Sequence, residues 1–442
     1  MASMNGVSRR TFVAGAGAAA ASGLVPIPAA WAAVDYKKYA GTKLEANLIK
    51  GPRGDLLQKH AKEFTELTGI IIESETIPEQ QQRQKAVIEL ASGKPSFDVM
   101  HLSYHVQKRQ FEKAGWLADI TPFMKNPSMT APDLVESDFS AAGLAYAKND
   151  KGQMLSLPMS VDYFILYYNK EIFEKAKVSV PKTLDEMNEL AVKLTDEKAG
   201  IHGYVGRGLK NANMTLWTNY FLNYGGEFLD AKGNILTDGP EAIEATKCYV
   251  RSNKSSPPGV AGFNWMEALA SFAQGRAAMW VDGVGWAPGV ENPNSSRIVG
   301  KVGYAMVPAG PKGQFSATYG DGLGIPAAST KKEAAYLYCQ WAVSKQMGAR
   351  LLQSGGGVPF RNSVLNDEDA RKGVTLPKEW LQAVIDAGKI SKLGLPVVIP
   401  VAEFRDLVGA AVTATLSGAD PAAELKKAHE QFRPILERSE KA

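Results

Sequence analysis

An aspartate lies between two tryptophans where a short apolar segment ends, in the order Trp280, Asp282 and Trp286. A carboxylate only accepts hydrogen bonds, so it selects neighbouring hydroxyl groups, and an indole ring covers the carbon-bearing face of a sugar or polyol. Segment 277–282 has the character of a short strand, so Asp282 is expected at its carboxyl end, beside a cleft. Trp280 falls inside this strand and is equally compatible with the core. Asp282 and Trp286 are therefore the first candidates for contact with a ligand.

A second aspartate, Asp162, lies between a proline and a buried strand. Pro158 lacks a backbone N–H and suits the entry to a strand, whereas the run 163–168 is apolar and aromatic without alternation. Such a run is typical of a strand that is buried on both faces. A carboxylate at this position needs hydrogen-bonding partners or access to a water-filled cleft, so Asp162 is also a candidate. The alternative is a turn aspartate whose oxygens accept from backbone amides.

Three further charged residues stand beside glycines. Arg207 ends a predicted strand, 200–208, and has a glycine on each side, which leaves room for its side chain to extend into a cleft. Asp321 also lies between two glycines, and Arg361 follows the glycine-rich loop 355–357. Glycine lets a backbone approach a ligand closely, although surface loops and tight turns have the same composition.

The first elements of the chain place two basic residues at the mouth of a parallel sheet. Strand 44–49, helix 55–68 and strand 70–74 form a βαβ unit, which requires parallel strands and a right-handed crossover. Ligands of such sheets bind beyond the carboxyl ends of the strands, where Lys50 and Arg53 lie. The alternative is that both residues are solvated turn charges.

The third predicted strand, 97–102, is followed at once by Tyr104 and His105. The same topological rule puts both side chains at the mouth of the sheet, beside Lys50. His101 and His105 are four residues apart, a spacing that on a helix presents two imidazoles to one metal ion. On a strand, positions four apart are separated by about 13 Å, too far to share an ion, so we expect no metal site.

The segment 157–173 joins two long blocks that each have the pattern of a complete α/β unit. We predict that it is a hinge strand, followed by a short helix that begins at Glu171. Segment 303–308 is predicted as a second crossing strand, and another strand is predicted to end within 320–326. Alternating strands and helices of this kind indicate the α/β class, with helices flanking parallel sheets.

The composition is that of an ordinary globular protein with two or three domains. The chain has 442 residues, of which 45% are apolar and 22% charged, so it can bury a large core. Its formal charge is +4 without a basic stripe, which argues against nucleic acid as a partner. Cys248 and Cys339 lie on separate predicted helices, and we expect two buried free thiols.

Residues 1–32 have the pattern of a twin-arginine export signal. Arg9 and Arg10 precede an apolar run rich in Ala and Gly, and small residues before Ala33 mark a cleavage site after Ala32. The apolar run is about 13 residues long, whereas a membrane span needs about 20, so we expect no insertion into a membrane. The pattern predicts an exported, periplasmic protein.

Several short segments follow one another in a characteristic order, 97–99, 157–158 with 168–170, 272–282, 324–326 and 357–361. Taken together, they resemble the extracellular solute-binding proteins of carbohydrate ABC importers, of the maltose-binding-protein type. The members for sugars and sugar alcohols are the most similar. The resemblance implies a two-lobed periplasmic-binding-protein fold of type II, with a mainly parallel sheet flanked by helices in each lobe and crossing hinge segments. It implies one lobe at 43–160 and 304–345, and the other at 161–303 and 346–442.

In this family the lobes close around a ligand, which is then delivered to a membrane permease. The resemblance therefore implies a sugar or sugar alcohol as ligand, permease subunits of an ABC importer as partners, no cofactor and no catalytic step. The family's ligand contacts fall on Lys50, Arg53, Tyr104, His105, Asp162, Arg207, Asp282, Trp286, Asp321 and Arg361. Two alternatives stay open: a secreted glycoside hydrolase with Asp162 and Asp282 as its paired carboxylates, and a carbohydrate sensor on the same scaffold.

Overall fold

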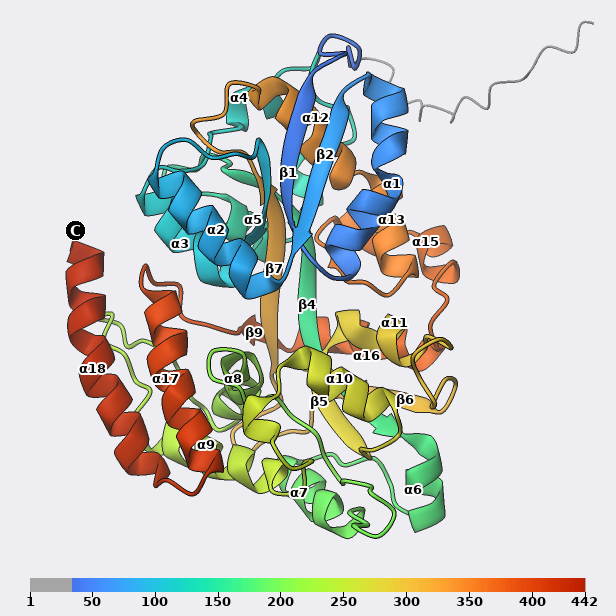
Figure 1. The fold of residues 1–442 in the computed structure, drawn as a ribbon, viewed down its shortest axis with the longest axis vertical. Coiled ribbons are helices and arrows are strands. Elements are labelled where there is room, and N and C mark those ends of the chain that lie inside the picture. The colour runs from blue at the N-terminus through green and yellow to red at the C-terminus, as the bar shows by residue number, and fades with distance from the viewer. Residues whose placement is uncertain (1–33, 442) are drawn as a thin grey trace, which may run out of the picture.

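The computed structural model describes residues 34–441, which form two lobes joined by strands that run through both (Figure 1). The predicted export signal, residues 1–32, lies outside the described residues. We call the part at the top of Figure 1 the upper lobe and the part at the bottom the lower lobe. The two-lobed α/β architecture predicted from the sequence is confirmed.

The upper lobe is built on three parallel strands. Its elements are β1 (Lys43–Ile49), α1 (Pro52–Thr68), β2 (Ile71–Ile77), α2 (Glu79–Ala91), β3 (Val99–Ser103), α3 (Tyr104–Lys113), α4 (Thr121–Met124), η2 (Glu136–Asp138), α5 (Ala141–Ala147), α12 (Lys332–Ala342), α13 (Lys345–Gln353), β8 (Val358–Pro359), α14 (Asn362–Leu365) and α15 (Glu368–Lys372). Strand β1 lies between β2 and β3 and pairs in parallel with both, as the predicted βαβ unit requires. Helix α1 begins at Pro52 instead of Asp55, because proline suits the first helical position.

The lower lobe contains most of the remaining helices. Its elements are α6 (Lys170–Ala176), α7 (Leu184–Lys193), α8 (Asn213–Asn223), α9 (Pro240–Asn253), η3 (Val260–Gly262), α10 (Trp265–Ala273), β5 (Met279–Gly283), η4 (Val284–Trp286), α11 (Ala287–Val290), β6 (Val302–Met306), α16 (Lys378–Lys389), β9 (Ser391–Leu393), α17 (Val401–Leu416) and α18 (Pro421–Lys441). The predicted strand 200–208 is not formed, and this segment makes isolated bridges instead, one of them between Val205 and Trp280. Arg207 therefore lies on a loop beside β5.

Two long strands connect the lobes, β4 (Ser156–Asn169) and β7 (Ser316–Gly324) (Figure 1). The first half of β4 pairs with β7, and its second half pairs with β5 and β6 in the lower lobe. Strand β4 therefore crosses between the lobes as predicted for the hinge. The prediction that 303–308 also crosses is wrong, because β6 pairs only with the lower half of β4, and β7 is the second crossing strand. The pairs of β4 with β5 and β6 are antiparallel, so the sheet is mixed and not mainly parallel in the lower lobe.

The core of the lower lobe includes the whole of α8, every residue of which is buried. Trp217 and Tyr220, which form an aromatic face on this helix, are therefore core residues. Cys248 and Cys339 are buried free thiols.

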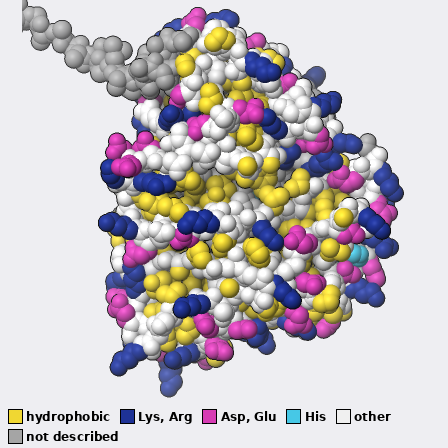
Figure 2. All heavy atoms as spheres, turned by 180° about the vertical axis from the view of Figure 1, so that it is seen from behind, with side chains coloured by type: hydrophobic (Ala, Val, Ile, Leu, Met, Phe, Trp, Pro, Cys, Tyr) yellow, Lys and Arg dark blue, Asp and Glu magenta, His cyan; other side chains and the backbone are white. Residues whose placement is uncertain are grey.

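Within residues 34–441, no helix is long and apolar enough to span a membrane, and no group of His, Cys, Asp and Glu could hold a metal ion. On the face in Figure 2, basic and acidic side chains are interspersed over the described part of the surface.

Candidate functional site

A cavity lies between the two lobes, beside the crossing strands. Its empty space is about 680 Å³, a volume that includes open solvent at its mouth. We call its upper-lobe side the upper wall, formed by Ile49, Lys50, Gly51, Pro52, Arg53, Glu79, Arg83, His101, Ser103 and His105. We call its lower-lobe side the lower wall, formed by Arg207, Thr215, Trp265 and Trp286. The crossing strands contribute Asp162, Phe164, Tyr319 and Asp321.

The turn between β1 and α1 brings Arg53 against both crossing strands. Gly51 has a φ of 140°, which favours glycine, and Pro52 starts α1 directly after it. The Arg53 guanidinium forms ion pairs with Asp162 on β4 at 3.1 Å and with Asp321 on β7 at 3.2 Å. These three residues were predicted separately from the sequence, and the fold joins them in one cluster. Lys50, also predicted, is exposed on the upper wall.

The two carboxylates on the crossing strands have different environments. Burial raises the pKa of Asp162 above its usual value in spite of Arg53 and of the hydrogen bond that Asp162 accepts from the Gly285 N–H at 3.2 Å. Burial also opposes ionisation of Asp321, but Arg53 and His101 outweigh it and hold the pKa of Asp321 well below its usual range. Asp162 is thus the carboxylate with more to gain from a further hydrogen-bond donor.

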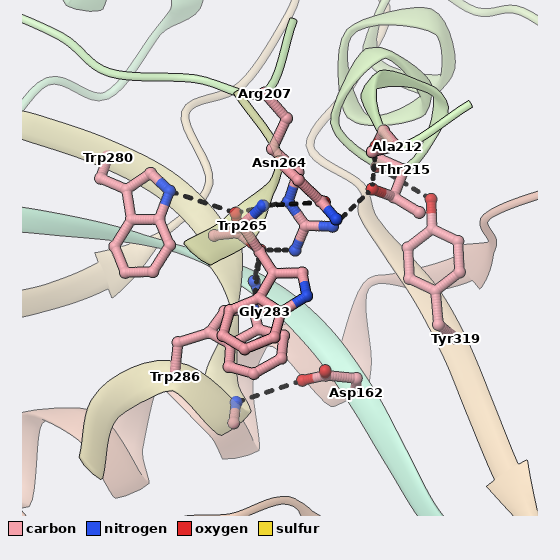
Figure 3. Close-up of polar contacts among 12 residues, drawn as sticks. Asp162, Arg207, Ala212, Thr215, Asn264, Trp265, Trp280, Gly283, Trp286 and Tyr319 are labelled. Atoms are coloured by element: carbon pink, nitrogen blue, oxygen red, sulfur yellow. Dashed lines mark hydrogen bonds and ion pairs between the residues drawn. The ribbon is translucent and has the colours of Figure 1, made fainter. Parts of the chain in front are cut away.

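Asp282 lies behind the lower wall and binds two of its residues, Arg207 and Trp286, although its own side chain does not line the cavity. Arg207 donates through Nε to Oδ2 at 2.8 Å and through Nη2 to Oδ1, and the indole N–H of Trp280 donates at 3.1 Å (Figure 3). The indole N–H of Trp286 donates at 3.0 Å and the Gly283 N–H at 2.7 Å. Asp282 is 0% exposed. The structure therefore differs from the prediction that Asp282 contacts the ligand, because its oxygens already accept from five protein donors.

Two tryptophans form an aromatic platform in the cavity. The rings of Trp265 and Trp286 are stacked, with centroids 4.1 Å apart and planes inclined by 7° (Figure 3). Trp265 is the first residue of α10 and lies inside the capping box that Asn264 and Glu267 form. Sequence analysis missed Trp265, although this capping pattern was a usable signal that a helix starts there.

On the upper wall, His105 is held in its neutral form by its neighbours. Arg83 donates to Ser103 Oγ at 2.9 Å, contacts His105 Nε2 at 3.3 Å and forms an ion pair with Glu79. His105 Nδ1 lies 3.4 Å from the Gly320 carbonyl oxygen, so the proton belongs on Nδ1 and Nε2 accepts from Arg83. Burial and the Arg83 charge lower the pKa of His105 to about 3. Sequence analysis missed Glu79 and Arg83, which have the pattern of exposed residues in the first turns of a polar helix.

Two predicted ligand residues lie away from this cavity. The Tyr104 hydroxyl forms a hydrogen bond with Ser156 Oγ at 2.7 Å, and its ring stacks on Tyr146. Arg361 donates through Nε to Asp138 at 2.7 Å and through Nη2 to the Asp133 carbonyl. Both side chains are buried and hold segments of the upper lobe together, so the structure corrects their predicted role as ligand contacts. A loop position beside glycines does not show which way a side chain points.

Several buried polar atoms of the upper wall have no hydrogen-bond partner within the described part of the chain. They are Nε of Arg53, Nε of Arg83 and Nδ1 of His101, whereas Nη2 of Arg53 lies 3.1 Å from Asp162 and Nε2 of His101 lies 3.6 Å from Asp321. Buried polar groups in folded proteins are almost always hydrogen-bonded, so unsatisfied groups around a cavity are candidates for ligand contact. Together with the carboxylates of Asp162 and Asp321, they can bind a small solute that has many hydroxyl groups.

Residues 50–349 match the model of a family described as bacterial extracellular solute-binding protein. The chain is 30% identical over 377 residues to a probable amino-acid ABC transporter periplasmic-binding protein of Sinorhizobium fredii, covering 83% of this chain and 84% of the relative. It is 26% identical over 353 residues to the erythritol/L-threitol-binding protein of Mycolicibacterium smegmatis, covering 75% and 73%. An ABC transporter solute-binding protein from Agrobacterium radiobacter K84, solved in complex with ribitol, superposes with a TM-score of 0.81 at 27% identity, covering 90% of this chain and 99% of the other.

Proposed function

This chain belongs to the bacterial extracellular solute-binding proteins and is the solute-binding component of an ABC transporter, and we propose that it binds a sugar alcohol or a small sugar between its lobes. The relatives that bind erythritol and ribitol support this class of solute. In this proposal the protein acts in the periplasm after removal of residues 1–32, and it delivers the solute to the permease subunits of its transporter. The lobe boundaries expected from the sequence, 43–160 with 304–345 and 161–303 with 346–442, are changed in this proposal. The segment 345–372, which contains α13, β8, α14 and α15, lies in the upper lobe, and β6 (Val302–Met306) lies in the lower lobe (Figure 1).

The observation that carries the proposal is an aromatic platform and two carboxylates in one cavity. The stacked rings of Trp265 and Trp286 offer an apolar surface to the C–H groups of a polyol. Asp162 and Asp321 lie on the crossing strands and accept hydrogen bonds from hydroxyl groups. A solute with both C–H faces and adjacent hydroxyls complements this arrangement.

Hinge closure is the proposed mechanism of capture. The cavity takes residues from both lobes, so a solute contacts the two walls together only when the lobes are close, and binding shifts the population to the closed form. Hydrogen bonds to neutral groups contribute about 0.5–1.5 kcal/mol each, and those to charged groups about 1.5–3 kcal/mol. A few such bonds account for micromolar binding, which corresponds to about 8 kcal/mol.

Asp282 gives no support to the alternative of a glycoside hydrolase. Such an enzyme needs two carboxyl groups that face the scissile bond. Asp162 lines the cavity, whereas both oxygens of Asp282 accept from buried donors. A pair made of these two residues would therefore lack one free carboxyl group.

The experiment is a ligand panel measured by thermal denaturation and calorimetry. Erythritol, ribitol, mannitol and maltose are compared with a set of amino acids, because one relative carries an amino-acid name. A polyol or sugar at a hundred times its dissociation constant should stabilise the protein by about 2.7 kcal/mol and be recovered unchanged. If only amino acids bind, or if a hydrolysis product accumulates, the proposal is wrong.

A variant pair on α10 links the binding to the aromatic platform. Trp265→Ala should weaken polyol binding by about 0.5–1.5 kcal/mol, because it removes one ring of the stacked pair. Its neighbour Met266 is 50% exposed and does not line the cavity, so Met266→Ala is the matched control and should bind normally. Equal affinities for the two variants would place the solute elsewhere.

A further inference from the structure

An ion pair joins the two lobes outside the cavity. Nη2 of Arg109, on α3 of the upper lobe, lies 3.2 Å from Oε2 of Glu440, in the last turn of α18 of the lower lobe. The C-terminal end of α18 reaches the level of α2 and α3 (Figure 1). Within residues 34–441, no other ion pair joins the lobes except the two that Arg53 forms with the crossing strands. Neither Arg109 nor Glu440 lines the solute cavity.

The Glu440 carboxylate is held in place for this contact. Its Oε1 accepts a hydrogen bond from the Ile399 N–H at 2.7 Å, which leaves Oε2 for Arg109. A negative charge in the last turn of a helix is opposed by the helix dipole, and the basic residues of this turn are Arg438 and Lys441. Glu440 is therefore at an unfavourable position for its own helix, and a cation of the other lobe offsets the cost.

An apolar contact lies beside the ion pair. Val106 is one turn before Arg109 on α3 and is 7% exposed. It is buried in the hydrophobic cluster of the lower lobe, together with Phe404 on α17 and Leu436 on α18. Helix α3 itself packs on β3, β7 and α5. One face of α3 thus belongs to the upper lobe, and the other contacts the lower lobe.

We propose that Arg109, Val106 and Glu440 form a latch that holds the two lobes together around a captured solute. This inference rests on the proposed function, because it adds a contact to hinge closure. Since α3 moves with the upper lobe and α18 with the lower, a rotation of the lobes about β4 and β7 separates Arg109 from Glu440. The ion pair therefore stabilises the closed form without touching the solute.

The exposure of the pair sets the size of the effect. The Arg109 and Glu440 side chains are each 30% exposed, so solvent weakens their attraction. A pair of this kind changes an equilibrium by about two- to fivefold. The latch consequently slows the opening of the lobes but does not prevent it, as a protein that must release its solute requires.

The test removes one charge at a time. Arg109→Gln and Glu440→Gln are titrated with erythritol, ribitol and mannitol by calorimetry, and the dissociation rates are measured by stopped flow. The amide oxygen that replaces the Glu440 carboxylate can still accept from the Ile399 N–H, so this change is confined to the charge. Each variant should raise the dissociation constant by about two- to fivefold, mainly through faster dissociation.

Asp150 provides a control on the same guanidinium. It lies in the upper lobe, 3.4 Å from Nη1 of Arg109, and its side chain is 86% exposed. Because Asp150 and Arg109 belong to one lobe, Asp150→Asn removes a partner of Arg109 without breaking the contact between lobes, and it should not weaken binding. The double variant of Arg109→Gln and Glu440→Gln should bind no more weakly than the weaker single variant, because both remove the same pair.

The outcomes separate this inference from the proposed function. If the original protein binds a polyol and both single variants bind it equally well, the latch is wrong and the proposed function stands. An equal loss of affinity in Asp150→Asn also overturns the latch, because the effect would then arise within one lobe. If none of the polyols binds the original protein, both the latch and the proposed function are wrong.

The distance between the lobes gives a second test, which needs no solute. Spin labels are attached at Ile88→Cys on α2 and Val192→Cys on α7, positions that are 69% and 70% exposed, whereas Cys248 and Cys339 are buried. In the empty protein, Arg109→Gln should raise the ratio of separated to closed lobes by about two- to fivefold. This shift should fade in about 1 M salt, where the screening length is about 3 Å. Equal distance distributions with and without Arg109→Gln would overturn the latch.

Discussion

The two walls of the cavity satisfy their polar groups in opposite ways. On the lower wall, Arg207, Thr215 and the Trp286 indole N–H are hydrogen-bonded within the protein, mainly through Asp282. Of the described residues, none on the lower wall has a buried polar side-chain atom without a partner, whereas the upper wall has such atoms on Arg53, Arg83 and His101.

This difference assigns different tasks to the two lobes. On the lower wall, Arg207 and the Trp286 indole are fixed by the buried acceptor Asp282, so this arginine and this ring are in place before a solute arrives. The upper wall has donors in reserve, so new hydrogen bonds form there when a solute arrives. In this view the solute first lies on the lower wall, and closure then brings the upper wall onto it. The predictions below test this division, beginning with the largest effect.

Asp282→Asn should weaken the hydrogen bonds that hold Arg207 and Trp286 in place on the lower wall. The variant keeps the shape of the side chain but leaves the buried Arg207 charge without its counter-ion, and one amide N–H group faces other donors. Breaking a buried pair of this kind costs about 3–5 kcal/mol, which should appear as a lower free energy of unfolding in urea. Polyol affinity should fall as well, because Trp286 loses its acceptor.

A surface carboxylate provides the control for this variant. Asp369 is 96% exposed in its side chain, so Asp369→Asn should leave the free energy of unfolding within about 0.5 kcal/mol of the original. A normal free energy of unfolding for Asp282→Asn, combined with weak binding, would return Asp282 to the direct ligand contact that its sequence position first indicated.

Much of the fold was predictable because its signals are local. The β1–α1–β2 unit and the buried run of β4 follow from hydrophobic patterns and glycine or proline boundaries, and they appear close to the predicted bounds. The second crossing strand was assigned to the wrong segment because β6 and β7 both have a strand pattern. Only the pairing partner decides which of them crosses, and pairing between distant strands leaves little trace in a single sequence.

The site was predictable in its location and less so in its contacts. Asp162 and Asp321 lie within the crossing strands β4 and β7, and they were candidates because of their neighbouring proline and glycines. The strand-end rule brought Arg53 and His105 to the cavity, since topology fixes where parallel strands end. It does not fix side-chain direction, and for this reason Asp282 and Arg361 were expected at the ligand although they are buried in the protein. Residue type gave no sign of their internal partners.

His105 tests the upper wall through pH. In the folded protein its pKa is about 3, against an ordinary value of 6.5, so below pH 6.5 the unfolded chain takes up a proton that the folded chain does not. The stability associated with neutral His105 is complete above pH 6.5 and is lost as the pH falls toward 3. Between pH 6.5 and pH 5 the loss in unfolding free energy is at most about 2 kcal/mol, because each pH unit contributes at most about 1.4 kcal/mol. The ring is partly exposed, so solvent screening reduces the loss further.

His105→Gln should remove this dependence. The difference in unfolding free energy between pH 7.5 and about pH 5 should be smaller in the variant than in the original by up to about 2 kcal/mol. Denaturant titrations at the two pH values measure this difference, and the other histidines cancel in the comparison. The window lies above the range where Glu79 and Asp321 take up protons, because both have lowered pKa values. An equal pH dependence in both proteins would show that His105 is not held neutral on the upper wall.

Lys50 should have the smallest effect, although it belongs to the same wall as Arg83. Lys50 is exposed and forms no ion pair with a described residue, whereas Arg83 is buried against Glu79 and Ser103. An exposed charge contributes about 0.2–1 kcal/mol, so Lys50→Gln should weaken binding of the solute by no more than about fivefold. This small loss should disappear as salt rises from about 0.01 M to about 1 M, because the screening length falls from about 30 Å to about 3 Å. Calorimetry at the two salt concentrations measures both effects. A loss as large as that of Arg83→Gln that also persists in high salt would mean that Lys50 binds the solute directly. Exposed and buried donors of the upper wall would then both contribute to binding.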